Sequence, residues 1–304
     1  MSLTTPLLVI GGPTAVGKSR IGAIVAQALG GEVLCADSRQ LYRDIPVTSA
    51  QPDAADLARA PHHLFGVLDP AEPVSAGKYR ELAEAAIGEV RGRGGLPVLV
   101  GGTGFYLAAA TGGMSLAPPV DPAVLSVLER RVAVEGLETL WRELLTLDAA
   151  SARRIMPGDA YRIVRALAIH RQTGQTASSF GGLAEPMPHR LVVLTMERAA
   201  LMARIEARCA AMLERDALAE ADALRARRLD PRSPVLRALG MPHLFAAAAG
   251  AITPAVALER MQRDSRRYAK RQLTWFRGRV DAVWVDAADP ERAAGEVVRL
   301  ARES

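Results

Sequence analysis

Short apolar runs alternate with amphipathic patterns over the first hundred residues. The runs at 7–10, 32–36 and 97–100 have the length and composition of buried strands. The segments 20–29 and 78–90 repeat apolar residues every three or four positions, which is typical of helices. Strands separated by helices in this way predict a parallel sheet with helices on both faces.

The pattern changes after Gly113. The proline-rich segment 116–122 predicts a linker, and 123–170 is helical in pattern with no convincing strand. Later elements are expected as strands at 191–195 and 283–285 and as helices at 198–227 and 254–277. We therefore expect an α/β core with an all-helical insertion domain. The expected boundaries are 1–114 for the first part of the core, 115–188 for the insertion and 189–304 for the rest of the core.

The composition is that of a globular protein. Of 304 residues, 49% are hydrophobic and 23% are charged, which excludes disordered and collagen-like chains. No apolar run reaches the roughly 18 residues of a membrane span, and the stretch at 7–10 is too short for a signal peptide. Two cysteines, Cys35 and Cys209, do not suggest a disulfide framework. We expect a soluble cytoplasmic protein without membrane contact.

The formal net charge of +5 is unevenly distributed. Residues 1–150 carry 12 Lys and Arg against 16 Asp and Glu, a net of −4, whereas residues 151–304 carry 26 against 17, a net of +9. Guanidinium groups match phosphate geometry, so an arginine-rich basic half suggests a polyanionic partner. A GC-rich codon bias also accounts for arginine over lysine, but it does not account for the asymmetry.

A phosphate-binding loop lies between the first strand and the first helix. Residues 12–19 match the pattern G-x-x-x-x-G-K-[ST], whose backbone N–H groups cradle a di- or triphosphate. Lys18 is expected to reach the outer phosphate and Ser19 to ligate Mg²⁺. The expected phosphate-binding residues are Gly12, Pro13, Thr14, Ala15, Val16, Gly17, Lys18 and Ser19. The sequence therefore predicts a P-loop fold that binds a polyphosphate with Mg²⁺.

An acidic residue near this loop is the candidate general base. The strand at 97–100 ends in Gly101-Gly102-Thr103 and lacks the acid that an ordinary ATPase carries there. The nearest acid is Asp37, at the end of the second strand. Ligands of open α/β sheets bind outside the carboxyl ends of the strands, so Asp37, Thr103 and the loop are expected to converge. A helix-cap or turn role for Asp37 is the alternative.

Seven segments, taken together, resemble the tRNA dimethylallyltransferase (tRNA isopentenyltransferase) family. They are residues 12–19, 37–42, 61–64, 101–106, 162–167 with 173–174, 204–208 and 268–277. A phosphate loop alone is common, but this ordered combination is specific and covers nearly the whole chain. The chain ends at Ser304 without the zinc-binding extension of some eukaryotic relatives, which points to the bacterial type.

The resemblance implies a reaction. A dimethylallyl group moves from dimethylallyl diphosphate to the exocyclic amine of the adenosine 3′-adjacent to the anticodon in tRNA, and diphosphate leaves. It implies that Asp37 is the general base and that Lys18, Arg208 and Mg²⁺ stabilise the departing diphosphate. It also implies that the helical insertion grips the anticodon stem-loop of a tRNA bound by a monomer. The tRNA-binding residues it implies are Asp37, Ser38, Arg39, Gln40, Thr103, Tyr161, Arg162, Ile163, Val164 and Arg165.

Two segments depart from the family pattern. Gly240-Met241-Pro242-His243 stands where members usually carry Gly-Tyr, a basic residue and an acid, within the 237–242 segment that supplies tRNA contacts. Thr48-Ser49-Ala50-Gln51-Pro52 stands where members carry Gly-Thr-Ala-Lys-Pro, so a lysine is absent near the crevice. Some of the eight basic residues within 260–279 are expected to contact RNA phosphates, whereas Trp275 and Phe276 are expected in the core.

Two other classes of protein share some of these features. A P-loop kinase of a nucleoside or small metabolite could use Asp37 as a base toward a hydroxyl group. An RNA-binding switch protein could use a nucleotide as a regulatory ligand, although Asp37 and the lack of a hydrolytic acid speak against it.

Overall fold

The computed structural model describes residues 7–113, 117–180 and 186–303. The chain divides into two compact units, a larger one of residues 1–111 and 187–304 and a smaller one of residues 112–186. The predicted boundary between residues 114 and 115 lies outside the described residues, and the one at 188–189 falls at the start of a strand. Each unit is described by itself below.

The larger unit is built on a six-stranded sheet in which every described pair of strands is parallel. The order is β3-β2-β4-β1-β5-β6. The strands are β1 (Leu7–Gly11), β2 (Gly31–Cys35), β3 (His62–His63), β4 (Leu96–Val100), β5 (His189–Thr195) and β6 (Val283–Asp286). The predicted P-loop-like α/β fold is confirmed. The sequence did not reveal β3, whose two residues are too few to show a pattern.

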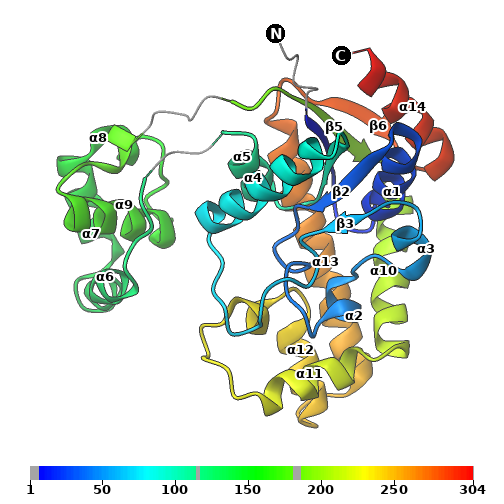
Figure 1. Cartoon of the computed structure of the whole chain (residues 1–304). Coiled ribbons are helices and arrows are strands. Elements are labelled where there is room, and N and C mark those ends of the chain that lie inside the picture. Colours follow the sequence, from blue (N-terminus) through cyan, green and yellow to red (C-terminus); the bar gives the residue numbers. More distant parts are fainter. Residues whose placement is uncertain (1–6, 114–116, 181–185, 304) are drawn as a thin grey trace. The chain divides into compact units, whose positions relative to one another are not determined.

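Helices cover both faces of this sheet, as predicted. Figure 1 shows α1 (Lys18–Leu29) and α14 (Pro290–Arg302) on one face and α4 (Ala76–Gly92) and α5 (Gly104–Ala110) on the other. All five residues of β1 are buried because the strand lies between β4 and β5. The end of β1 therefore opens at the middle of the sheet, where loops from both sides can reach it.

Four helices pack together beyond the strands: α10 (Arg198–Glu214), α11 (Ala217–Ala226), α12 (Met241–Ala248) and α13 (Pro254–Arg277). In Figure 1 they extend below the sheet. The prediction of one helix over 198–227 is wrong, because the backbone of Arg215 is extended, with ψ of −163°, and separates α10 from α11. Shorter helical segments are α2 (Pro46–Ser49), α3 (Ala54–Leu57) and η2 (Pro234–Arg237).

The smaller unit is helical throughout its described residues. Its elements are α6 (Pro122–Glu135), α7 (Leu137–Leu147), α8 (Ala149–Ala152), α9 (Ala160–Thr173) and the short η1 (Ala177–Phe180). Leu128, Leu140, Leu144 and Ile163 are almost fully buried in one cluster. Asp121, Asp148 and Asp159 cap α6, α8 and α9 by accepting hydrogen bonds from backbone N–H groups. The unit thus has a core of its own.

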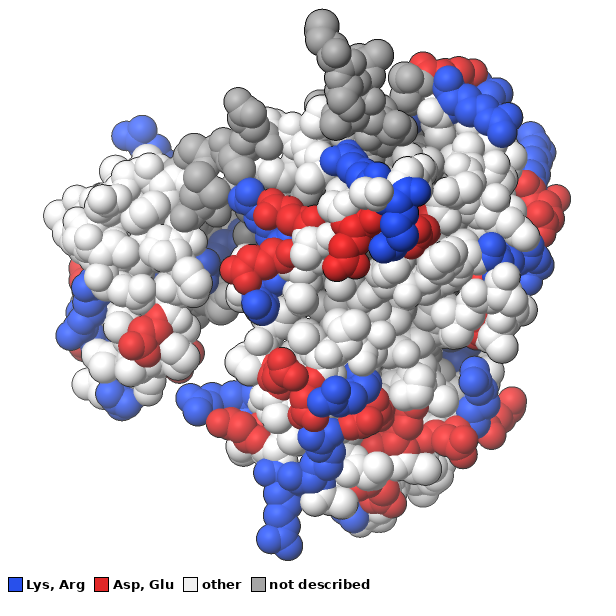
Figure 2. All heavy atoms as spheres, in the orientation of Figure 1, with Lys and Arg blue, Asp and Glu red and all other residues white. Residues whose placement is uncertain are grey.

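Charged side chains of both signs share the surface. Figure 2 shows acidic and basic groups interspersed over the face in view. Several arginines of α13 are ion-paired: Arg263 lies 3.1 Å from Asp264, and Arg266 lies 3.0 Å from Glu206. Among the described helices, none combines the length and the apolar character needed to cross a bilayer.

Candidate active site

The phosphate loop connects β1 to α1. Gly17 caps α1 with φ of 103°, a conformation that a residue with a side chain rarely adopts. The helix then begins at Lys18, whose Nζ donates a hydrogen bond to the carbonyl oxygen of Pro13 at 2.7 Å. The loop and the amino end of α1 therefore present a concave, donor-rich surface suited to an anion.

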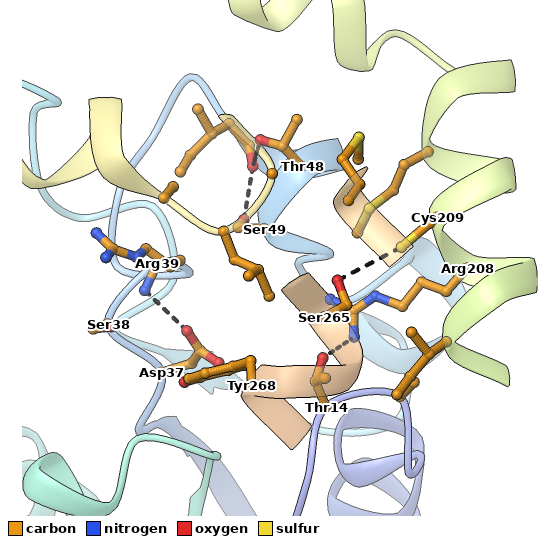
Figure 3. A pocket seen from close by; sticks show the side chains of 18 of the residues that line it. Thr14, Asp37, Ser38, Arg39, Thr48, Ser49, Arg208, Cys209, Ser265 and Tyr268 are labelled. Carbon is orange, nitrogen blue, oxygen red and sulfur yellow. Dashed lines mark hydrogen bonds between the residues drawn. The ribbon is translucent and has the colours of Figure 1, made fainter. Parts of the chain in front are cut away.

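Two desolvated cations border this loop. Nη1 of Arg208, on α10, donates to the hydroxyl of Thr14 at 3.0 Å, as Figure 3 shows. Burial lowers the pKa of Lys18 to about 8, the Asp37 carboxylate opposes that change, and the charge of Arg208 adds to it. Burial also lowers the pKa of Arg208, again against the opposing effect of Asp37. An anion bound between the two cations would relieve this cost.

Asp37 follows β2 at the carboxyl edge of the sheet. Its Oδ1 accepts a hydrogen bond from the backbone N–H of Arg39 at 2.9 Å, which closes a tight turn. Within the described chain, the other oxygen accepts no hydrogen bond from protein and remains available to a ligand. The N–H of Ser38 donates to Oγ1 of Thr103 at 3.1 Å, so the loops after β2 and β4 are joined.

Tyr268, on α13, lies beside Asp37 (Figure 3). Burial and the nearby Asp37 charge raise the pKa of Tyr268 to about 12, although the Thr103 side chain lowers it in part. The phenol therefore keeps its proton at neutral pH. Asp37 lies next to a neutral hydroxyl group and within electrostatic reach of two cations.

Two cavities meet at these residues. The first, which we call the α13 cavity, has a volume of about 340 Å³ and is lined by the loops after β2 and β4 together with α10, α13 and residues 237–240. The second, the loop cavity, has a volume of about 330 Å³ and is lined by residues 17–20 and 49–53 among others. Thr14, Asp37 and Arg208 line both cavities. The Asp37 carboxylate and the Arg208 guanidinium group therefore lie where a ligand in one cavity would contact a ligand in the other.

Comparison with known proteins identifies the family of this chain. A family model described as IPP transferase matches residues 40–279, and one described as isopentenyl transferase matches residues 5–63. This chain belongs to the IPP transferase family. It is 43% identical over 294 residues to a tRNA dimethylallyltransferase of Halorhodospira halophila, covering 94% of each chain. It is 45% identical over 296 residues to one of a Methylobacterium species, covering 95% of this chain and 96% of the relative.

Solved structures agree with the family assignment. A tRNA isopentenylpyrophosphate transferase of Bacillus halodurans is 34% identical, with a TM-score of 0.73 and coverage of 99% of this chain and 96% of that one. A eukaryotic dimethylallyltransferase acting on tRNA is 26% identical, with a TM-score of 0.78 and coverage of 96% and 77%. The predicted family resemblance is confirmed.

The structure of this IPP transferase family member brings most of the predicted residues together. Asp37, Ser38, Arg39 and Thr103 line the α13 cavity, whereas Lys18, Ser19 and Gln40 line the loop cavity. The Gln40 amide nitrogen donates to the carbonyl oxygens of Ala50 and Ser49 at 2.5 and 3.3 Å. Its Oε1 accepts a hydrogen bond from Sγ of Cys35 at 3.8 Å, so contacts within the protein fix both ends of this amide.

The other predicted tRNA contacts lie in the smaller unit, on α9. Tyr161 is 72% exposed, and Arg162 is exposed and pairs with Asp159 at 3.4 Å. The side chains of Ile163 and Val164 are packed in the core of that unit, and Arg165 is half-buried. Tyr161 and Arg162 are thus the side chains of this group most accessible to a partner.

The two departures from the family pattern have structural roles of their own. Gln51, which stands at the lysine position, donates from Nε2 to the carbonyl oxygens of Gln40 and Tyr42 at 3.1 and 2.9 Å. It therefore braces the segment that follows Asp37. His243, at the altered glycine-tyrosine segment, lies 2.8 Å from Oδ2 of Asp264 on α13.

Sequence reasoning missed two buried polar residues around the site. Glu220, on α11, accepts hydrogen bonds from the N–H groups of Val47 and Thr48 at 2.6 and 2.8 Å and so holds α2 in place. Gln272, on α13, contacts the phosphate loop. Gln272 falls within the family-like segment 268–277, but no local pattern shows that a residue so distant in sequence reaches Thr14.

Proposed function

We propose that this protein transfers a dimethylallyl group from dimethylallyl diphosphate to the exocyclic amine of the adenosine 3′-adjacent to the anticodon in tRNA, releasing diphosphate. The observation that carries the proposal is the meeting of two cavities at Thr14, Asp37 and Arg208. A transfer between two separately bound substrates needs such a junction. Membership of a family whose relatives are named tRNA dimethylallyltransferase supports this choice of substrates.

The diphosphate end of the donor belongs in the phosphate loop. The backbone N–H groups of residues 15–19 and the cations Lys18 and Arg208 suit an anion that gains charge as its bond to carbon breaks. The loop after β4 carries no acid that would activate water, which suits a diphosphate that leaves intact rather than one that is hydrolysed.

The α13 cavity suits the acceptor base. A base in an anticodon loop has to leave its stack before an enzyme can act on it, and it then occupies a closed pocket. At about 340 Å³ this cavity lies within the range of small-ligand sites, and Ser38, Thr103 and Tyr268 offer it hydrogen-bonding groups. Arg237 and Arg271 in its wall suit the adjoining phosphates.

The reaction then follows from these positions. The bond between C1 of the dimethylallyl group and the diphosphate oxygen breaks, and its electron pair goes to that oxygen. The amine nitrogen forms the new bond to C1 and gives up one proton to the Asp37 carboxylate. Lys18 and Arg208 stabilise the charge that develops on the departing diphosphate.

Mg²⁺ is the cofactor in this proposal. Across residues 7–113, 117–180 and 186–303, no three His, Cys, Asp or Glu side chains gather into a metal site made by protein alone. The Ser19 hydroxyl in the loop cavity fits Mg²⁺, which retains waters and takes phosphate oxygens as further ligands. When bound beside Ser19, Mg²⁺ would offset part of the diphosphate charge.

The smaller unit is proposed to bind the anticodon stem-loop through exposed groups of α9. Tyr161 and Arg162 offer an aromatic ring and a guanidinium group to RNA.

We also propose that the protein acts in the cytoplasm, where its tRNA substrate is found, and that it acts as a monomer. A solution mass near 32.4 kDa would support the monomer, and twice that mass would contradict it.

One assay tests the reaction. Purified protein is incubated with Mg²⁺, unmodified tRNA and dimethylallyl diphosphate labelled in the prenyl group, and in parallel with ATP labelled in the terminal phosphate. We expect the prenyl label in tRNA at the adenosine beside the anticodon. Phosphate label on a nucleoside or metabolite without prenyl transfer would instead identify a kinase.

A further inference from the structure

Gln272 forms a clamp between two loops of the candidate active site. It lies on α13 with 5% of its surface exposed. Its Oε1 accepts a hydrogen bond from the backbone N–H of Thr14 at 2.8 Å, and its Nε2 donates to the carbonyl oxygen of Gly102 at 2.9 Å. One amide therefore satisfies a donor of the phosphate loop and an acceptor of the loop after β4.

The contact leaves no space between the partners. A Cβ atom added to Gly102 would lie 2.2 Å from Nε2 of Gln272, 3.2 Å from the carbonyl oxygen of Gly12 and 3.3 Å from Nζ of Lys18. The contact with Gln272 thus requires a glycine at position 102. The phosphate loop, the lysine that it carries and the loop after β4 meet around this amide.

The clamp continues toward Asp37. The residue after Gly102 is Thr103, whose hydroxyl oxygen accepts the N–H of Ser38 at 3.1 Å. Tyr268, one helical turn before Gln272 on α13, lines the α13 cavity together with the same Thr103. Gln272 is therefore linked through one loop to the backbone next to the candidate general base and, through Thr14, to Arg208.

We propose that Gln272 is a positioning residue that holds the diphosphate loop in register with the loop beside Asp37. The inference rests on the proposed function and adds a role for a residue that touches neither reacting group. Unlike a residue that only fills space, it fixes the distance between the two substrates. Its loss should lower turnover more than it lowers affinity for either substrate.

The test compares Gln272→Met with Gln262→Met in the full-length protein. Both glutamines lie on α13, but Gln262 is at the surface and donates to the carbonyl oxygen of Glu206 at 3.3 Å. We expect Gln272→Met to reduce kcat by about ten- to a hundredfold, because two buried partners lose their hydrogen bonds. We expect KM for tRNA to change by less than about threefold, KM for dimethylallyl diphosphate to rise several-fold but by less than kcat falls, and Gln262→Met to match the wild type.

A double-mutant cycle with Thr103→Val tests whether Gln272 acts through the loop after β4. If Gln272 acts through the loop after β4, the double variant should have a kcat within about threefold of the slower single variant. Losses that multiply would overturn the proposed coupling, as would equal kcat values for Gln272→Met and Gln262→Met. If Gln272→Met does not fold, Gln272→Glu keeps the acceptor for Thr14 and loses the donor for Gly102. A wild-type kcat for that folded variant would also overturn the inference.

Direct binding of inorganic diphosphate separates this inference from the proposed function. A wild-type protein that fails to prenylate tRNA would contradict the proposed function. The diphosphate affinity of Gln272→Met would still test the clamp, since a phosphate loop released from Thr14 should bind diphosphate several-fold more weakly than Gln262→Met does. Equal affinities in such an inactive protein would overturn the clamp as well.

Discussion

At the scale of single residues, the site places the Asp37 carboxylate beside a backbone donor and two cations. Arg39 fixes one oxygen of Asp37 through its backbone N–H, and the charges of Lys18 and Arg208 face the carboxylate. Such a group can accept a proton from a weakly basic amine as that amine forms a bond to carbon. The same cations then face the diphosphate that leaves.

Asp37→Asn should therefore affect the chemical step. We expect kcat for prenyl transfer to fall by about 10² to 10⁴, because general base catalysis contributes on that order. The dissociation constant for tRNA should stay within about threefold of the wild-type value. Asp286→Asn, at the exposed end of β6, serves as the control with wild-type kcat. A parallel loss of tRNA affinity and turnover would contradict the base role.

Lys18→Met should stabilise the free protein at neutral pH. The folded protein holds the Lys18 proton up to a pH of about 8, whereas the unfolded chain holds it up to 10.5. Below pH 8 the folded state bears the full cost of the buried ammonium group, and between pH 8 and 10.5 the free energy of unfolding rises as that cost is lost. We expect Lys18→Met to raise the free energy of unfolding at pH 7 by on the order of 1–3 kcal/mol.

Chemical denaturation over this pH range measures the effect. The advantage of Lys18→Met over the wild type should shrink as the pH rises from 8 to 10.5. Lys78→Met, at an exposed position of α4 that pairs with Glu81, should leave the free energy of unfolding unchanged. A pH-independent difference between Lys18→Met and the wild type would contradict a desolvated ammonium.

Residue types in a motif were predictable, whereas their long-range partners were not. The phosphate loop, Asp37 and Thr103 follow from a strand, a turn and a helix that are local in sequence. The hydrogen bonds that Thr14 donates to Gln272 and that α2 donates to Glu220 join segments that share no pattern. Packing of α11 and α13 creates them, and the sequence does not encode that packing in any short window.

At the scale of elements, α11 holds the short helix α2 against the α13 cavity. Glu220 is 9% exposed and caps α2, which supplies Thr48 and Ser49 to the cavity wall. A four-residue helix has little stability of its own, so this contact decides where those side chains lie.

Glu220→Ala should destabilise the protein and weaken its acceptor site. Two backbone N–H groups would lose their acceptor, so we expect the free energy of unfolding to fall by about 2–3 kcal/mol and KM for tRNA to rise. Glu214→Ala, at the exposed end of α10, should change stability by less than about 0.5 kcal/mol. Denaturant unfolding and initial rates over a tRNA titration measure both effects, and equal stability of the two variants would contradict the cap.

Helix α9 gives the second prediction at this scale. Arg162→Glu should weaken tRNA binding about tenfold and reduce the slope of log affinity against log salt by about one, since one phosphate contact is lost. Arg142→Glu, at an exposed position of α7 beside Glu138, is the matched control in the same unit. Filter binding at several salt concentrations measures both. An unchanged slope for Arg162→Glu would place the RNA contact elsewhere.

The elements themselves were more predictable than their breaks. β1, β2, β4 and β5 are apolar runs in the sequence, and each is buried in the sheet. The interruption at Arg215 was missed because residues 198–227 contain neither glycine nor proline and keep a helical period. The break lets α11 take its own direction and bring Glu220 to α2, a tertiary contact that no short window of the sequence shows.

At the scale of the whole molecule, the charge asymmetry does not produce a surface of one sign on the face in Figure 2. Many arginines of the basic half are paired with acids, as Arg266 is with Glu206. The cations of the diphosphate site are desolvated, whereas Arg162 and much of α13 face solvent. The binding of tRNA and the binding of dimethylallyl diphosphate should therefore depend differently on salt concentration.

Raising KCl from about 0.05 M to about 0.3 M should raise KM for tRNA by about tenfold or more, because exposed phosphate contacts are screened. KM for dimethylallyl diphosphate should rise by less than about threefold, because its partners are shielded from solvent ions. Initial rates with each substrate varied in turn provide the measurement. A steeper salt dependence for the small substrate would contradict this division of the charges.

The bond between Thr14 and Gln272 spans 258 residues, which also sets a delay during synthesis. A ribosome that adds about 5 to 20 residues per second needs roughly 10 to 50 seconds to travel from one partner to the other. Asp37 follows the phosphate loop early in that interval and Arg208 joins late in it, but Gln272, which fixes their spacing, arrives only at its end. Competence for group transfer should therefore arise in one late step, after α13 has been synthesised.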